Sequence, residues 1–113
     1  MTYEKLSIVI PCYNEEKTIE ALAGRVISAG RSGLGLEVII VDDGSSDKSG
    51  EIIARLAERN DSVQTIAHTK NQGKGAALRS GFALSTGDIV LVQDADLEYD
   101  PNEYEKLLDP ILS

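Results

Sequence analysis

Short apolar segments alternate along this chain with longer segments of helical periodicity, and this alternation limits the possible folds more than any other feature. Four short segments are apolar and rich in β-branched residues, and they predict strands over 6–10, 36–41, 63–67 and 89–92. Apolar residues recur at helical spacing in the segments that follow, which predicts helices over 17–29, after Ser46 or Asp47, over 76–84 and over 102–112. Strands that are apolar on both faces and separated by helices indicate a parallel sheet covered on both sides.

The connections between the strands narrow the topology further. Right-handed crossovers favour a doubly wound α/β sheet of about four strands in the order 3-2-1-4, with helices on both faces. In such sheets ligands bind beyond the carboxyl ends of the strands. The segments that follow the first, second and fourth predicted strands, 11–16, 42–47 and 94–98, are all polar or acidic. We therefore expect them to converge on one edge of the sheet and to form the functional site.

The composition restricts the partners and the compartment. The chain has 113 residues, enough for one domain, and its formal net charge of −8 argues against a nucleic-acid backbone as partner. Cys12 is the only cysteine, so an internal disulfide is excluded, and we interpret it as a buried residue rather than a nucleophile. No apolar stretch approaches the roughly 20 residues of a membrane helix. We expect a soluble, cytoplasmic chain.

Carboxylates at the end of the fourth predicted strand predict a metal site. Asp94 and Asp96 flank Ala95, and alternate residues of an extended backbone point the same way, with Glu98 next in phase. Hard divalent cations such as Mg²⁺ and Mn²⁺ prefer carboxylate oxygens and leave coordination sites open for substrate phosphates. The alternative is a solvated turn, but the position after a buried strand favours the metal site.

A second acidic pair, Asp42 and Asp43, ends another predicted buried strand. A carboxylate at this place can accept hydrogen bonds from a nucleobase N–H or a ribose hydroxyl, whereas its alternative role is to cap the following helix. Gly44 permits a sharp turn directly after the pair. We interpret Asp43 as a ligand contact and Asp47 as a helix cap.

A Gly-Lys-Gly segment, 73–75, precedes the third predicted helix. It is only part of a dinucleotide-binding fingerprint, because Leu78 occupies the third glycine position. Two roles stay open for it: phosphate contact through Lys74, or a loop of small residues needed for close packing. His68, the only histidine, is interpreted as a surface residue.

Four ordered motifs carry a resemblance to a known family. They are 8–15 (IVIPCYNE), 41–47 (VDDGSSD), 71–81 (NQGKGAALRSG) and 94–97 (DADL). Together they resemble the family 2 inverting glycosyltransferases of the A-type fold, whose first half is Rossmann-like. The most similar branch is that of the polyprenol-phosphate enzymes, the dolichyl-phosphate mannosyltransferases and their bacterial glucosyl relatives. The resemblance extends over about residues 6–98, and the order of the motifs makes it specific.

The resemblance implies a UDP- or GDP-sugar as donor and a role for each matching position. The implied nucleotide contacts are Pro11, Tyr13, Asn14, Glu15, Val41, Asp42, Asp43, Lys74, Asp94, Ala95 and Asp96. Glu15 would lie near the ribose, and Asp43 would recognise a base N–H. Asp94 and Asp96 would be the catalytic residues, because they would hold the diphosphate through Mg²⁺ or Mn²⁺, with Glu98 as a further metal ligand.

The family also implies an activity. The sugar is transferred with inversion, to a polyprenyl phosphate or another glycan acceptor, and an anionic lipid phosphate needs no strong general base. The resemblance implies a longer chain than this one. We therefore expect residues 1–113 to be the donor-binding part of a glycosyltransferase domain, truncated at its C-terminus. This part is expected to bind the donor without transferring it, and to self-associate through an exposed sheet edge or the final helix. We expect the full-length protein at the cytoplasmic face of a membrane.

Three other classes of protein are weaker interpretations. A sugar nucleotidyltransferase would need a glycine-rich, basic loop after the first strand, where this chain has Asn14-Glu15-Glu16. A receiver-like signalling module would place its acidic pair after the first strand, whereas the pair here follows the second. A dinucleotide-binding domain would place its glycines after the first strand, which ends here in Pro11.

Overall fold

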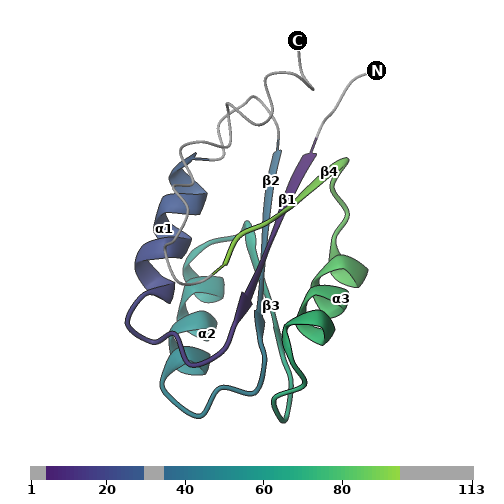
Figure 1. The fold of residues 1–113 in the computed structure, drawn as a ribbon. Helices are drawn as coiled ribbons and strands as arrows, with labels where there is room; N and C mark the ends of the chain where they lie inside the picture. Colours follow the sequence, from purple (N-terminus) through teal and green to yellow (C-terminus); the bar gives the residue numbers. More distant parts are fainter. Residues whose placement is uncertain (1–4, 30–34, 95–113) are drawn as a thin grey trace.

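Four parallel strands form the middle layer of the fold (Figure 1). The computed structural model describes residues 5–29 and 35–94. The strands are β1 (Lys5–Cys12), β2 (Gly35–Asp42), β3 (Val63–Ala67) and β4 (Ile89–Val92). They pair in the order β3-β2-β1-β4, with every pairing parallel. The predicted doubly wound order 3-2-1-4 is therefore confirmed.

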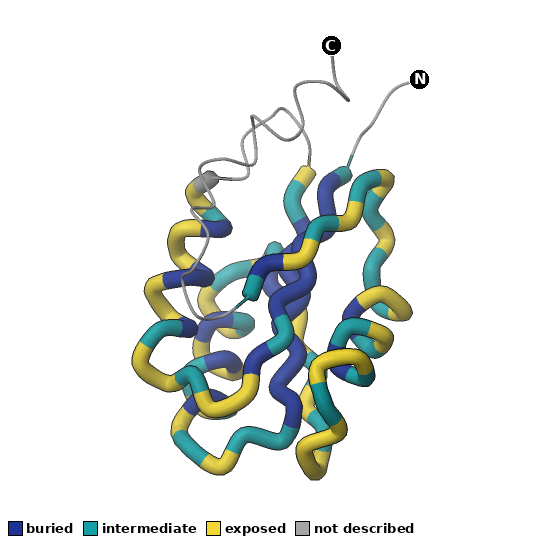
Figure 2. Tube along the Cα trace, viewed as in Figure 1, coloured by how far each residue is buried: buried dark blue, intermediate teal, exposed yellow. Residues whose placement is uncertain are grey.

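Helices cover both faces of this sheet (Figure 1). They are α1 (Ile19–Ala29), α2 (Ser49–Arg59) and α3 (Lys74–Leu84). The helices α1 and α2 bury one face, on which Ile8, Ile10 and Ile40 lie in the larger apolar cluster. The opposite face, with Val9 and Ile39, packs against α3, so the central strands are buried on both sides (Figure 2). Within the described ranges, no helix has the length and apolar character needed to cross a bilayer.

The strand β1 continues through Pro11, where the sequence predicted its end. Proline lacks a backbone N–H and normally interrupts a sheet where a neighbour needs that donor. In this sheet the carbonyl of Val9 accepts the last bond from the β4 side, donated by Gln93 N–H at 3.0 Å. The described pairing of β1 with β4 ends at Val9 and Val92, so the missing donor of Pro11 leaves no bond of that ladder unmade.

The helices begin close to, but not at, the predicted residues. The first helix starts at Ile19 rather than 17, because the Thr18 carbonyl accepts the Leu22 N–H at 2.9 Å and opens the helix there. The bond from Ile19 N–H to the Glu15 carbonyl, also 2.9 Å, closes a separate turn before it. The helix α3 starts at Lys74 rather than 76, with the Gly73 carbonyl bonded to Ala77 N–H at 3.1 Å. The predicted helix over 102–112 lies outside the described residues.

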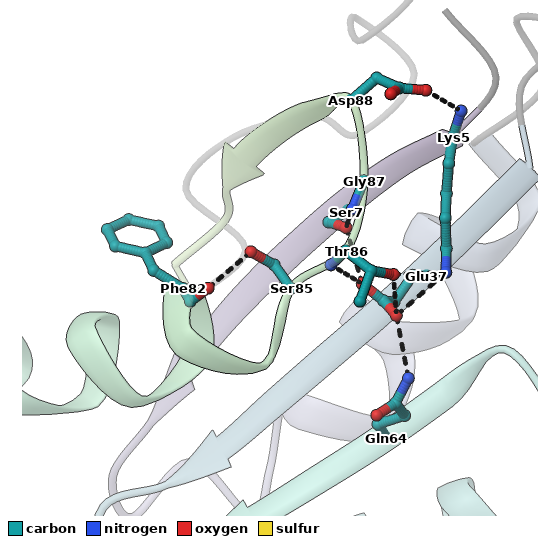
Figure 3. Close-up of polar contacts among 9 residues, drawn as sticks. All are labelled: Lys5, Ser7, Glu37, Gln64, Phe82, Ser85, Thr86, Gly87 and Asp88. Carbon is teal, nitrogen blue, oxygen red and sulfur yellow. Dashed lines mark hydrogen bonds and ion pairs between the residues drawn. The ribbon is translucent and has the colours of Figure 1, made fainter.

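A buried carboxylate ties the α3–β4 connection to the sheet (Figure 3). Glu37 is 3% exposed, and its Oε1 accepts the Ser7 hydroxyl at 2.7 Å and the Thr86 N–H at 2.9 Å. Its Oε2 accepts the Gln64 amide at 2.9 Å and pairs with Lys5 Nζ at 3.3 Å. Burial alone would raise the pKa of Glu37, but hydrogen bonds led by Thr86 and Ser7 outweigh it and hold the pKa at about 2.

Candidate functional site

The carboxyl ends of β1, β2 and β4 border one cleft of about 480 Å³, together with the start of α3. This volume is in the range of small-molecule sites. The described residues that line it are Pro11, Cys12, Tyr13, Glu15, Asp43, Asn71, Gly73, Lys74, Ala77 and Asp94. The expectation that the polar segments meet at one edge is thus confirmed for the described residues. The cleft is also lined by residues of the 71–77 segment. This segment was not among the three strand ends that we expected to converge.

The loop after β1 is braced against the loop after β2. Asn14 has a φ of 53°, and its side-chain oxygen accepts the Ser46 N–H at 2.8 Å and the Asp47 N–H at 3.3 Å. Its own N–H donates to the Ser45 hydroxyl at 2.9 Å. The amide of Asn14 therefore holds the two loops together, and Asn14 is not among the described residues that line the cleft. The neighbouring Tyr13 does line it and keeps 47% of its surface exposed.

Asp47 completes this brace from the other loop. One carboxylate oxygen accepts the N–H of Ser49, the first residue of α2, at 2.9 Å, and the other accepts the Glu16 N–H at 3.2 Å. Burial opposes ionisation, but these hydrogen bonds outweigh it and lower the pKa of Asp47. The side chain thus satisfies a donor at the start of α2. The N-cap residue of this helix is however Lys48, which makes no side-chain capping bond, so the interpretation of Asp47 as the cap itself was wrong by one position.

Asp43 lines the cleft, but its carboxylate is already occupied by protein donors. Its Oδ1 accepts His68 Nδ1 at 2.8 Å and Gln72 N–H at 2.9 Å. Its Oδ2 accepts Gly73 N–H at 2.9 Å and the Asn71 amide at 3.0 Å. A carboxylate offers about four acceptor positions, and these bonds use them all. Burial would raise the pKa of Asp43, but the bonds from His68, Gln72 and Gly73 outweigh it and lower the pKa.

His68 is not a surface residue, and that interpretation was wrong. Its side chain is only 9% exposed, because the ring lies between two partners: Nδ1 bonds Asp43 and Nε2 bonds the Ser80 hydroxyl at 2.9 Å. The backbone N–H of His68 donates to the Asp42 carbonyl at 2.8 Å and so extends the β2–β3 ladder by one residue. No local pattern in the sequence pointed to this position, since all three contacts come from distant segments.

Two other predicted contacts of the nucleotide lie away from the cleft surface. Val41 is fully buried against α3, and the Asp42 carboxylate accepts the Ser45 N–H at 3.0 Å within its own loop. Neither is among the described residues that line the cleft. Their predicted contact with a nucleotide stays a prediction.

Gly44 explains how closely the loops after β2 and β3 approach each other. Its φ is +71°, and a Cβ at this position would collide with the backbone of Lys70 and Asn71. Only glycine satisfies both the left-handed backbone and the contact. The second motif therefore shapes the cleft through its glycine as well as through its carboxylates.

An ion pair spans the cleft between Lys74 and Asp94. Lys74 is the first residue of α3, and its ammonium contacts the Asp94 carboxylate just beyond β4. Asp94 thus lies where the metal was predicted, with a carboxylate oxygen of the kind that Mg²⁺ and Mn²⁺ prefer. Ala95, Asp96 and Glu98 lie outside the described residues. Among the residues that are described, no group of three or more potential ligands could hold a metal ion.

Cys12 lines the cleft but is 1% exposed, as its interpretation as a buried residue predicted. Burial is the largest influence on its thiol and raises the pKa to about 11. A thiol with so high a pKa is almost entirely protonated at neutral pH, and the protonated form is a poor nucleophile.

A parallel sheet of this order, with a loop-built cleft at its carboxyl ends, defines a Rossmann-like α/β protein. The family described as Glycosyl transferase family 2 matches residues 7–113. The chain belongs to this family, as its four motifs predicted.

The curated relatives include two enzymes of one name, undecaprenyl-phosphate 4-deoxy-4-formamido-L-arabinose transferase. The protein from Pseudomonas paraeruginosa is 42% identical over 106 residues, which cover 92% of this chain and 31% of the relative. The protein from Salmonella paratyphi B is 37% identical and covers 93% of this chain and 33% of its own length. The chain therefore spans about a third of the length of the curated relatives it matches.

Solved structures of glycosyltransferases share the fold. A mannosyltransferase from Pyrobaculum calidifontis, in complex with GDP-Man and Mn²⁺, superposes with a TM-score of 0.76 at 29% identity over 90% of this chain and 30% of that one. Glucosyl-3-phosphoglycerate synthase from Mycobacterium tuberculosis, in complex with Mn²⁺, UDP and glucosyl-3-phosphoglycerate, has a TM-score of 0.77 at 26% identity. That match covers 97% of this chain and 40% of the other. The expected A-type glycosyltransferase architecture is confirmed.

Proposed function

We propose that this chain binds a nucleotide-diphospho-sugar together with a divalent cation, as the donor-binding part of an inverting glycosyltransferase. The observation that carries the proposal is the cleft at the carboxyl ends of the strands, where Lys74 and Asp94 face each other. Family membership and the two solved complexes, one with GDP-Man and one with UDP, support it. We propose a UDP- or GDP-sugar as the donor.

The lining of the cleft suggests how the donor is held. The exposed ring of Tyr13 offers a flat surface for the nucleobase, and Glu15 beside it offers a carboxylate to the ribose hydroxyls. The Lys74 ammonium, at the start of α3, is placed for the diphosphate, to which the N-terminus of a helix is also favourable. Asp43 contributes by holding the wall that contains Asn71 and Gly73.

The residues at the end of β4 fit a divalent metal. Asp94, with Asp96 and Glu98, would hold Mg²⁺ or Mn²⁺, and both solved complexes cited above contain Mn²⁺. The cation would supply positive charge against the diphosphate that leaves with the electrons of its bond to the sugar. Lys74 is bonded to Asp94 in this structure and adds a second positive charge at the same end of the cleft.

The proposed acceptor is a polyprenyl phosphate, and the name of the two curated relatives supports this class. In the transfer, a phosphate oxygen of the acceptor forms a bond to C1 of the sugar while the C1–oxygen bond to the nucleoside diphosphate breaks on the opposite face. Because the acceptor oxygen is already anionic, no base has to remove a proton from it. Because a lipid acceptor lies in a membrane, we propose that the whole enzyme works at a membrane, on its cytoplasmic face.

We also propose self-association through the β4 side of the sheet. Val90 and Val92 of this strand are 39% and 43% exposed, and apolar residues at the side of a sheet favour assembly. Light scattering is expected to show a dimer or a larger assembly, and a monodisperse monomer would contradict this part of the proposal.

Calorimetry tests the donor site directly. The full chain is titrated with UDP, GDP and their sugars, with and without Mn²⁺, and binding is expected for one nucleotide series and only with the metal. Asp96→Ala is expected to abolish the metal-dependent binding without changing the circular dichroism spectrum. The matched control is Asp61→Ala, an exposed aspartate in the loop before β3. Absence of binding to every nucleotide, or unchanged binding by Asp96→Ala, would contradict the proposal.

A further inference from the structure

Three side chains from three separate parts of the sequence form a continuous chain of hydrogen bonds behind the cleft wall. Asp43 follows β2, His68 follows β3, and Ser80 lies within α3. His68 Nδ1 is 2.8 Å from Asp43 Oδ1, and Nε2 is 2.9 Å from Ser80 Oγ. The exposed fractions of the His68 and Asp43 side chains are 9% and 4%, so water has little access to either group.

The chemistry of the carboxylate fixes the direction of the bond to the ring. The lowered pKa of Asp43 keeps it ionised at neutral pH, and an ionised carboxylate only accepts hydrogen bonds. The proton on the ring must therefore be on Nδ1 of His68. In the neutral ring Nε2 is then an acceptor, and the Ser80 hydroxyl donates to it.

The orientation of the Asp43 carboxylate decides where the cleft wall lies. The same two oxygens that meet the ring and the Asn71 amide also accept the backbone N–H groups of Gln72 and Gly73. These donors belong to the segment that supplies Asn71, Gly73 and then Lys74 to the cleft. Loss of the His68 bond would leave the carboxylate oriented only by donors of this segment itself and would weaken the attachment of the segment to the end of β2.

We propose that His68 is a positioning residue for the donor site, which acts through Asp43 to hold the 71–74 wall in its ligand-binding conformation. The inference rests on the proposed function, since it concerns the cleft assigned to the nucleotide-sugar. Ser80 orients the ring from the opposite side and thereby ties α3 to the same group.

The order carboxylate, imidazole, hydroxyl is also that of a hydrolase triad. A nucleophile of that kind needs hydrogen-bond donors aimed at the oxygen of its substrate. Ser80 lies inside α3, whose interior N–H groups donate to carbonyls of the same helix, so the helix provides no such donors around it. The arrangement is therefore suited to orientation rather than to covalent catalysis.

Three substitutions of His68 separate the effect of its bond to Asp43 from the effect of its bond to Ser80. His68→Asn places an amide N–H near the position of Nδ1 and retains the donor to Asp43, while it loses Ser80. His68→Gln places its amide near the position of Nε2 and retains Ser80, while it loses Asp43. His68→Leu loses both bonds, and Thr69→Ala, at an exposed neighbouring position, is the control.

Two readouts are measured on the full chain for each variant. Calorimetry with the nucleotide and Mn²⁺ is expected to show binding about tenfold or more weaker for the Gln and Leu variants, and within about threefold of wild type for the Asn variant. Amide hydrogen exchange is expected to be about tenfold or more faster at Gln72 and Gly73 in the Gln and Leu variants only. In the wild-type chain alone, the ¹⁵N shifts of the single histidine are expected to show the proton on Nδ1.

The outcomes distinguish this inference from the proposed function. If the wild-type chain binds no nucleotide, the proposed function fails, and amide exchange alone decides whether His68 holds the 71–74 segment. If wild type binds and all variants bind equally well, the inference is overturned. An equal loss in all three variants, Asn included, would also overturn it, because a general packing defect does not depend on which bond is retained.

Discussion

Replacement of Glu37 by glutamine tests how much the polar cluster at the amino end of the sheet contributes to stability. The substitution preserves size but removes the charge that meets donors from Ser7, Gln64, Thr86 and Lys5 (Figure 3). The amide of glutamine also turns one acceptor into a donor, which then faces other donors. A buried mispaired group of this kind is costly.

The magnitude follows from the pKa. The pKa of Glu37 falls from 4.5 to about 2 on folding, and at about 1.4 kcal/mol per unit this corresponds to roughly 3 kcal/mol of stability at pH 7. A folded-state pKa below the unfolded one means that this contribution is present above the unfolded pKa and is lost as the pH falls towards the folded pKa. The contribution is expected to be about 2 kcal/mol smaller at pH 3 than at pH 7.

Urea unfolding of wild type and Glu37→Gln at several pH values from 7 to 3 measures both quantities. The control is Glu58→Gln, an exposed glutamate on α2, for which a change within about 0.5 kcal/mol is expected. Equal midpoints at pH 7 would refute the reasoning. So would a difference that does not shrink as the pH falls, because the loss would then come from packing rather than from the charge.

Three further substitutions or treatments test other contacts. Gly81→Ala is expected to lower the free energy of unfolding by about 1–3 kcal/mol, measured by urea titration, because its Cβ would collide with the Val9 side chain under α3. Asn14→Ala is expected to weaken nucleotide binding about tenfold in calorimetry, since it removes the acceptor that joins the first two loops. Cys12 is expected to react with a thiol reagent only after addition of denaturant, in a spectrophotometric assay, because it is 1% exposed and has a pKa of about 11.

The fold could be predicted from the sequence because its signals are local. Each strand is a short β-branched segment, the helices α1 and α2 carry an apolar stripe, and the handedness of crossovers then leaves few orders of strands. The predicted ends of strands and helices were less accurate where a residue distant in the sequence determines them. Pro11 continues β1 only because the described pairing with β4 ends at Val9, and nothing near Pro11 in the sequence indicates that.

The site could be predicted only in part, from the rule that ligands bind beyond the carboxyl ends of parallel strands. That rule identified the loops after β1, β2 and β4, and with them Tyr13, Glu15, Asp43 and Asp94. It could not distinguish a carboxylate that faces a ligand from one that braces a loop. The distinction depends on donors 25 to 30 residues away, such as His68 and Gly73, whose positions are known only when the sheet is assembled.

The two neighbouring carboxylates of the second motif have different partners. Asp42 and Asp43 are adjacent, yet the alternation of the strand sends one towards α2 and the other towards α3. Asp43 reaches the cleft, but its four acceptor positions are filled by donors of the protein. A nucleobase N–H could bond to it only by displacing one of those donors, at a cost of the same order as the bond it would form. In the proposed donor site the wall that Asp43 holds would therefore select the base by shape, while the carboxylate itself keeps the wall in place.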